Sequence, residues 1–474
     1  MFNNLINNCI RYMKFLNFGL KNYKGISKEI IIKVGDLCCF VGNNESGKTT
    51  ILSGIEQIGK LCSGEKLVNG NRNKCRPKST SFTGDIVFFA DLSLEEGEAK
   101  KLALNSQDII KISFTYKFEN SQFAGDDEDV SEVFVNDSKI TNQKKNKIID
   151  FIKDNAPEIK YFDDFKFEVP EKIRFLKNTA SVKEEEKKDK LLTDTKNIEW
   201  QHIFDDLLNE AVFPSSEERY KFQDQVVDWD VKYEIGDTST IGNRMLGINK
   251  YLNKVVSTDW KDVNDSGAVF DEFYIDRKQN YDNSNFVDYV LRAKTTCNEY
   301  EIPERSKGCQ WYFCFKVRTD IRANRNKRGI VFLLDEPASN LHIHPQQKIL
   351  DSITDLSKKS NIAVIYSTHS PFLLDLSEEN IDNTYIVENR SNDNDDKPNI
   401  EFNKLSEYKS ENAQITLEPL IDNVLLKLLK KKDDENRSSF LGAIKSKCKT
   451  LYGCIEVANN LKDFLEPIIK KIQT

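Results

Sequence analysis

The segment Gly42–Thr49, which reads GNNESGKT, constrains this chain more than any other feature of its 474 residues. It fits the pattern G-x-x-x-x-G-K-[ST], follows the apolar run Leu37–Val41 and precedes an amphipathic stretch that begins at Lys48. In such a strand–loop–helix context, glycines let backbone N–H groups turn inward around a phosphate, and the helix N-terminus adds partial positive charge. The segment therefore predicts a phosphate-binding loop, with a glycine-rich turn that holds no ligand as the structural alternative.

Two side chains at the end of this loop suit a nucleotide polyphosphate and its metal ion. Lys48 can reach the oxygens of the β- and γ-phosphates, and the hydroxyl of Thr49 suits Mg²⁺. We therefore expect the nucleotide to contact the whole loop, which consists of Gly42, Asn43, Asn44, Glu45, Ser46, Gly47, Lys48, Thr49 and Thr50.

A continuous apolar run, Ile330–Leu334, ends in the acidic pair Asp335 and Glu336. A run that is apolar at every position is typical of a central parallel strand covered on both faces. In parallel sheets, ligands bind at the carboxyl ends of the strands. We therefore expect Asp335 to hold the water shell of the metal, and Glu336 to polarise the water that attacks the γ-phosphate.

A second apolar run, residues 361–366, is followed by the sequence STHSP, which contains His369. An amphipathic segment separates the two runs, so their spacing fits one right-handed βαβ unit. This unit would place Asp335 and His369 at neighbouring strand ends, where His369 could contact a γ-phosphate or simply be a hydrogen-bonded polar residue. A metal site at His342 and His344 is a weaker alternative, because their i, i+2 spacing lacks an obvious third ligand.

Composition and charge narrow the class of protein. The formal net charge of −7 excludes a globally basic nucleic-acid coat, although local basic patches remain open. No apolar run approaches the roughly 18 residues that a membrane span needs, and the N-terminal residues lack a secretory pattern. Ten cysteines without a CxxC pair argue against a disulfide scaffold and against a zinc module. We therefore expect a cytoplasmic protein that has no membrane partner.

These motifs together resemble the ATP-binding-cassette-type heads of the SMC and RecF class, and most closely their OLD-like branch. The resemblance rests on GNNESGKTT, on LLDEPASNLH (residues 333–342), on STHSPFLLD (residues 367–375) and on RSKGCQW (residues 305–311). The last of these looks like the shortened signature motif of that branch. The resemblance implies an α/β fold, an ABC/SMC-type P-loop ATPase head with a mixed sheet, an inserted α+β or helical region and a helical C-terminal tail.

The resemblance, together with the strand and helix patterns along the sequence, predicts that the chain has four parts. The expected parts are the N-terminal lobe of the head at residues 1–95, an inserted dimerisation or regulatory region at 96–265, the rest of the head at 266–410 and the helical tail at 411–474. The inserted region and the tail are the surfaces that we expect to serve assembly and effector binding.

The resemblance further implies that the cofactors are ATP and Mg²⁺ and that two heads hydrolyse ATP as a sandwiched pair. Each nucleotide would lie between the phosphate-binding loop of one subunit and Ser306 and Gly308 of the other, with Asn340 at the same seam. His369 would be the switch histidine. The expected catalytic residues are thus Lys48, Glu336 and His369, while no Q-loop glutamine can be placed in this sequence.

Many relatives of the OLD type carry a C-terminal Toprim nuclease, which this chain does not match. Glu388 and the Asp393-x-Asp395 pattern resemble its acidic residues superficially, but only four residues separate Glu388 from Asp393, within a polar turn. These features are more typical of a hairpin that completes the ATPase sheet. Any nuclease chemistry would then belong to another chain.

Stand-alone ATPases of this branch, such as the AriA type, occur in anti-phage defence systems. The resemblance therefore implies a sensor or regulatory ATPase that forms a homo-oligomer around ATP and controls a separate effector protein such as a nuclease. The alternative is a RecF/SMC-like DNA-maintenance ATPase that binds DNA ends or junctions. The sequence leaves open whether DNA is a partner.

Overall fold

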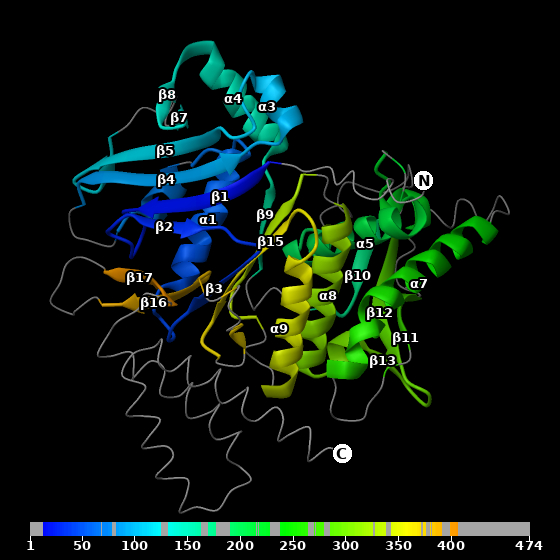
Figure 1. The fold of residues 1–474 in the computed structure, drawn as a ribbon. Coiled ribbons are helices and arrows are strands. Elements are labelled where there is room, and N and C mark those ends of the chain that lie inside the picture. Colours follow the sequence, from blue (N-terminus) through cyan, green and yellow to red (C-terminus); the bar gives the residue numbers. More distant parts are fainter. Residues whose placement is uncertain are drawn as a thin grey trace, which may run out of the picture. The chain divides into compact units, whose positions relative to one another are not determined.

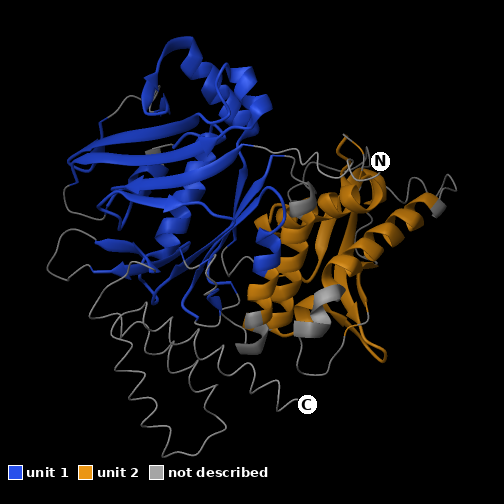
Figure 2. Ribbon diagram, in the orientation of Figure 1, with its two compact units in different colours: residues 1–163, 327–339, 353–474 blue, residues 164–326, 340–352 orange. Residues whose placement is uncertain are grey.

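The computed structural model describes residues 13–405 with internal gaps. The gaps are residues 68, 78–81, 125–130, 163–168, 177–189, 215, 217, 228–237, 264–269, 271, 279–284, 326–327, 338–342, 371–372, 376–379, 381 and 391–398. The chain forms two compact units (Figure 2). The first comprises residues 1–163, 327–339 and 353–474, and the second comprises residues 164–326 and 340–352.

One sheet of the first unit is antiparallel throughout and has the strand order β2-β1-β4-β5-β7-β8, with β6 paired to β5. Its strands are β1 (Lys14–Lys21), β2 (Ile30–Lys33), β4 (Gly84–Ser93), β5 (Ile109–Glu119), β6 (Gln122–Phe123), β7 (Ser131–Val135) and β8 (Ser138–Ile140). Buried and more exposed positions alternate along much of β4 and β5, as in a sheet with one face on the core.

The second sheet of this unit is mixed and has the order β17-β16-β3-β15-β14-β9. Its strands are β3 (Leu37–Val41), β9 (Glu158–Phe162), β14 (Ile330–Leu334), β15 (Ile362–Thr368), β16 (Thr384–Asn389) and β17 (Ile400–Lys404). All neighbours are parallel except β16 and β17. Every residue of β3 and of β14 is buried, which explains their continuous apolar sequences.

Helix α1 (Lys48–Cys62) packs between the two sheets (Figure 1), because it contacts β1 and β4 of one and β9 and β15 of the other. Its residues Ile51, Leu52, Ile55 and Ile58 are completely buried in the core that both sheets share. The shorter helices α2 (Asn69–Cys75), α3 (Glu96–Leu102) and α4 (Asn142–Asn155) belong to the same unit.

The second unit contains a small antiparallel sheet with the order β10-β12-β11, and β13 pairs with β12. Its strands are β10 (Ile173–Leu176), β11 (Glu272–Lys278), β12 (Phe286–Lys294) and β13 (Glu299–Glu301), and its helices are α5 (Thr195–Val212), η3 (Gln223–Val227), α7 (Thr238–Val263), η4 (Ile302–Glu304) and α8 (Lys307–Arg325). Aromatic side chains form its core: Phe175, Phe204, Phe222 and Tyr289 contact one another. Helix α9 (Ile343–Ser357) has residues in both units.

The expected α/β fold with a mixed sheet is confirmed, as is the antiparallel hairpin β16–β17 at the edge of that sheet. The compact units have other boundaries than the expected parts. Residues 96–163 belong to the first unit because β5 pairs with β4 and β9 pairs with β14, whereas β11–β13 belong to the second unit. The tail at 411–474, Asp393 and Asp395 lie outside the described residues.

Candidate nucleotide-binding site

The phosphate-binding loop connects β3 to α1 and needs glycine at two places. Gly47 has φ +106°, and a Cβ atom there would lie 2.4 Å from Cδ1 of Ile400. A Cβ atom on Gly42 would lie 2.3 Å from the carbonyl oxygen of Val387. The strands β16 and β17 therefore press against the loop so closely that larger residues would displace it.

Lys48 is 4% exposed, and its ammonium group has three partners among the described residues. Nζ donates to the carbonyl oxygens of Gly42 at 2.8 Å and Asn43 at 2.9 Å, and it lies 3.0 Å from Oε1 of Glu336. The side chain thus folds back along its own loop and meets the end of β14. This contact brings together Lys48 of the loop and Glu336, which follows the acidic strand end.

Asp335 is 6% exposed, and both of its carboxylate oxygens accept hydrogen bonds. The hydroxyl of Ser367 donates to Oδ1 at 2.5 Å, and the hydroxyl of Tyr161 donates to Oδ2 at 2.8 Å. Ser367 also accepts a hydrogen bond from the backbone N–H of Glu336 at 2.9 Å. Strands β9, β14 and β15 therefore jointly orient this carboxylate.

Glu336 adopts a left-handed backbone conformation, with φ +49°, that residues other than glycine rarely adopt. Its Oε2 atom lies 2.6 Å from Nδ1 of His369 and accepts a hydrogen bond from the backbone N–H of His369 at 3.2 Å. The carboxylate is thus held between Lys48 and His369. Strained residues of this kind persist where surrounding contacts hold them, and they concentrate at functional sites.

The predicted arrangement of strand ends is confirmed. Strand β15 lies parallel between β3 and β14, with Leu334 opposite Tyr366 and Val41 opposite Thr368. The backbone N–H of Gly42 donates to the carbonyl of Thr368 at 3.3 Å, which joins the loop to β15. His342 and the side chain of His344 lie outside the described residues, so the weaker metal-site alternative stays a prediction.

The loop fits a polyphosphate chemically. The hydroxyl of Ser46 is buried and has no hydrogen-bond partner within the described parts of the chain. Leaving a buried hydroxyl unpaired costs roughly 1–3 kcal/mol, and a phosphate oxygen would supply a partner.

The other predicted loop residues lie at the surface or close to it. Asn43, Asn44, Glu45 and Thr49 are exposed, and Thr50 is half-buried in the first turn of α1. The first N–H groups of such a helix lack intrahelical acceptors and attract anions.

The signature-like residues lie in the second unit. Ser306 is exposed and directly precedes α8, where its hydroxyl accepts a hydrogen bond from the backbone N–H of Cys309 at 3.4 Å. The guanidinium of Arg305 lies 4.5 Å from the ring centre of Tyr300. Gln310 donates to the carbonyl of Arg305 at 2.9 Å, which fixes the turn before the helix. Gly308 is half-buried in the first turn of α8, and Asn340 lies outside the described residues.

Two polar side chains beneath the loop are neutral at physiological pH. Burial raises the pKa of the Cys39 thiol to about 12, and burial likewise raises the pKa of Tyr366 well above its ordinary value. Neither group therefore serves as an ionised nucleophile, and both contribute to the packing under the site.

Sequence reasoning missed Tyr161 and assigned no role to Ser367. Tyr161 contacts Asp335 across 174 positions of the chain, and only the pairing of β9 with β14 creates that contact. Ser367 could have been suspected because it lies two residues before His369 on the same strand end. No local pattern in the sequence marks Tyr161 as part of the site.

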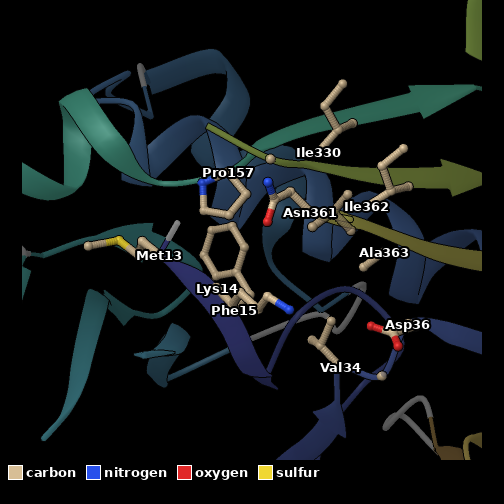
Figure 3. A pocket seen from close by; sticks show the side chains of 13 residues that line it. Met13, Lys14, Phe15, Val34, Asp36, Pro157, Ile330, Asn361, Ile362 and Ala363 are labelled. Atoms are coloured by element: carbon tan, nitrogen blue, oxygen red, sulfur yellow. The ribbon is translucent and has the colours of Figure 1, made fainter. Parts of the chain in front are cut away.

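A pocket lies at the opposite end of the same parallel strands (Figure 3). It is lined by residues at the starts of β14 and β15, such as Ile330 and Ile362, together with Phe15, Val34 and Asp36. A strand of five residues spans about 16 Å, so this pocket is well separated from Asp335 and His369. The acidic residues, the histidine and the loop all gather at the carboxyl end instead.

Similar proteins include an uncharacterised protein of Methanocaldococcus jannaschii, MJECL43, which is 36% identical over 97 residues; that match covers 20% of this chain and 23% of the other protein. Among solved structures, an SMC head bound to the C-winged helix domain of ScpA is 13% identical with a TM-score of 0.43, covering 82% of this chain and 96% of that one. The SMC head domain from Thermotoga maritima is 12% identical with a TM-score of 0.39, covering 79% of this chain and 94% of that one.

No helix within the described residues is long and apolar enough to cross a membrane. The family description "AAA ATPase domain" matches residues 13–374, which include the phosphate-binding loop, the acidic strand end and His369. This match covers most of the chain and agrees with the geometry of the loop and strand ends. The chain therefore belongs to the AAA ATPase domain family.

Proposed function

We propose that this chain is a Mg²⁺-dependent ATPase that closes as a homo-oligomer around ATP and thereby controls a separate effector protein. The ATPase assignment is supported by one observation: four residues lie together at one end of the mixed sheet, namely Lys48, Asp335, Glu336 and His369. A lysine at the phosphates, a carboxylate that can hold Mg²⁺ and a second group that can orient water are the parts used for phosphoryl transfer to water.

Each residue has a defined role in this proposal. The ammonium of Lys48 would bind the β- and γ-phosphate oxygens and stabilise the charge that develops on them. Thr49 and Asp335 would hold Mg²⁺, which supplies further positive charge at the phosphates. Glu336 would orient the attacking water and accept its proton, while His369 holds Glu336 in place and can reach the γ-phosphate.

The oligomeric part of the proposal rests on the resemblance of residues 305–311 to a signature motif. Ser306 is exposed before α8, so its hydroxyl is accessible to a second copy of the chain. Two subunits that enclose one polyphosphate would exclude water and add hydrogen-bond donors where charge develops. The effector part of the proposal, a role in anti-phage defence, is supported by the resemblance of the sequence to OLD-like and AriA-type ATPases.

The first experiment measures ATP hydrolysis and particle mass for the wild-type protein, Lys48→Ala, Glu336→Gln and Glu336→Gln/Ser306→Arg. We expect Lys48→Ala to lose ATP binding, and Glu336→Gln to accumulate an ATP-dependent oligomer that Ser306→Arg prevents. Ser216→Arg, at another exposed serine of the second unit, is the matched control and should leave the oligomer intact. Wild-type hydrolysis rates in Glu336→Gln would refute the assignment of Glu336 as base.

A second experiment tests the separate effector. The chain alone, incubated with ATP and Mg²⁺ or Mn²⁺, should not cleave DNA. A protein that co-purifies with Glu336→Gln in the presence of ATP should have the effector activity. DNA cleavage by the chain alone would contradict the proposal. Tight DNA binding with a steep dependence on salt would favour the DNA-maintenance alternative instead.

A further inference from the structure

The carboxylate of Asp335 is held from two sides by hydroxyl groups on different strands. Ser367 on β15 donates to one oxygen at 2.5 Å, and Tyr161 on β9 donates to the other at 2.8 Å. Each carboxylate oxygen can accept more than one hydrogen bond, so both keep capacity for a metal ion or for metal-bound water. The two hydroxyls therefore fix the orientation of Asp335 without consuming its ability to bind a cation.

The position of Tyr161 follows from the register of β9. This strand pairs in parallel with β14, and Tyr161 lies opposite Leu333. The pairing is anchored at both ends, because Glu158 N–H donates to the carbonyl of Gly329 at 3.0 Å and Asp335 N–H donates to that of Phe162 at 2.9 Å. The phenol is therefore held at the level of the carboxylate by backbone hydrogen bonds, not by a flexible loop.

Ser367 and Tyr161 differ in what else they orient. The hydroxyl of Ser367 also accepts the backbone N–H of Glu336, so replacing Ser367 would disturb both acidic residues. The hydroxyl of Tyr161 can be removed by a change to phenylalanine that keeps the ring. Tyr161 thus offers a way to loosen Asp335 while the Glu336–His369 contact remains.

We propose that Tyr161 is a positioning residue for the divalent cation: its hydroxyl holds Asp335 in the orientation that binds Mg²⁺ beside the phosphates. This inference rests on the proposed ATPase function. Partners that orient a metal-binding side chain typically contribute about 10- to 100-fold to metal affinity. Tyr161 should therefore govern the Mg²⁺ requirement of the site, and leave the binding of metal-free nucleotide unchanged.

The test compares the wild-type protein with Tyr161→Phe in two binding measurements. Fluorescence of a mant-ATP probe is titrated with Mg²⁺, and electron paramagnetic resonance counts Mn²⁺ bound in the presence of ATP. For Tyr161→Phe we expect the half-saturating cation concentration to rise about 10- to 100-fold, with mant-ATP affinity in EDTA unchanged. Incorporating 4-aminophenylalanine at position 161, which restores a hydrogen-bond donor, should recover most of the loss.

Tyr23→Phe is the matched control, because Tyr23 is a buried tyrosine of the same unit whose hydroxyl lies 3.0 Å from Oγ of Ser53. It should leave the cation requirement unchanged. Equal cation requirements in wild type and Tyr161→Phe, with normal ATP binding in both, would overturn this inference alone. A wild-type protein that binds no ATP would overturn the proposed function, and this inference with it.

Discussion

Nζ of Lys48 lies 3.0 Å from Oε1 of Glu336, so the proposed phosphate-binding cation and the proposed catalytic base form an ion pair. The carboxylate side chain is 22% exposed and the lysine side chain 5%, which places this pair partly away from solvent screening. A γ-phosphate and Glu336 would therefore compete for the same ammonium group. The effect of replacing Glu336 depends on this competition.

Replacing Glu336 by glutamine should increase ATP affinity, because it removes the competing charge and the repulsion between carboxylate and phosphate. Hydrogen bonds to charged groups contribute about 1.5–3 kcal/mol, which corresponds to a gain of at least about ten-fold. Equilibrium titration with mant-ATP measures the change. Glu56→Gln, which alters a half-buried pair with Lys60 on α1, should leave the affinity unchanged. A lower affinity in Glu336→Gln would mean that the ion pair does not compete with nucleotide.

Replacing His369 by alanine should slow hydrolysis while ATP still binds. Nδ1 of His369 lies 2.6 Å from Oε2 of Glu336, and misplacing a catalytic group by about 1 Å can cost about 100-fold in rate. Steady-state kinetics should show this loss in kcat, with a much smaller change in the dissociation constant of ATP. His202→Ala, at an exposed histidine on α5, is the control. An unchanged kcat in His369→Ala would separate His369 from the chemistry.

Replacing Gly47 by alanine should both destabilise the first unit and weaken nucleotide binding. The left-handed backbone at φ +106° costs a residue with a Cβ atom roughly 1–2 kcal/mol, and that atom would lie 2.4 Å from Ile400. The double variant Gly47→Ala/Ile400→Ala removes the clash but keeps the backbone strain, so it should recover part of the ATP affinity. Thermal unfolding and mant-ATP titration measure both effects. Gly97→Ala has open space around its Cβ position and should be neutral or slightly stabilising.

Replacing Asp288 by asparagine should destabilise the second unit in a way that depends on pH. Burial alone would raise the pKa of Asp288, but the hydrogen bonds and charge of Arg174, together with Lys172, hold this pKa below its ordinary value. The ionised pair therefore contributes stability above the unfolded pKa of about 3.9, and the contribution disappears as the pH falls through the lower folded value.

At pH 7 we expect the asparagine variant to lose about 3 kcal/mol in the free energy of unfolding, because the charge of Arg174 loses its interaction with the Asp288 carboxylate. The difference from the wild type should shrink below about pH 4. Urea denaturation at several pH values, followed by tryptophan fluorescence, tests this; Trp200 and Trp311 are buried in the second unit. Asp150→Asn, at an exposed pair with Lys153, should change stability by less than about 1 kcal/mol at any pH. A pH-independent loss in Asp288→Asn would point to packing instead of charge.

Features that depend on neighbouring residues could be predicted from the sequence. The loop at residues 42–49 is flanked directly by its strand and its helix, so its place in the fold and the phosphate binding proposed for it follow from neighbouring residues. The adjacency of Asp335 and His369 also followed, because one βαβ unit with a fixed handedness connects their strands. Within that short range, spacing and residue type were sufficient.

Other features arose only when distant segments paired. Alternating strand patterns between residues 84 and 140 do not specify their partners, and the structure joins them to β1 in one sheet. The contact of Tyr161 with Asp335 requires β9 to pair with β14 in one particular register. A shift of one residue would turn Tyr161 to the other face of the sheet. Local motifs and their spacing thus determined which reactive residues come together at the strand ends. Long-range strand pairing decided which other side chains surround these residues.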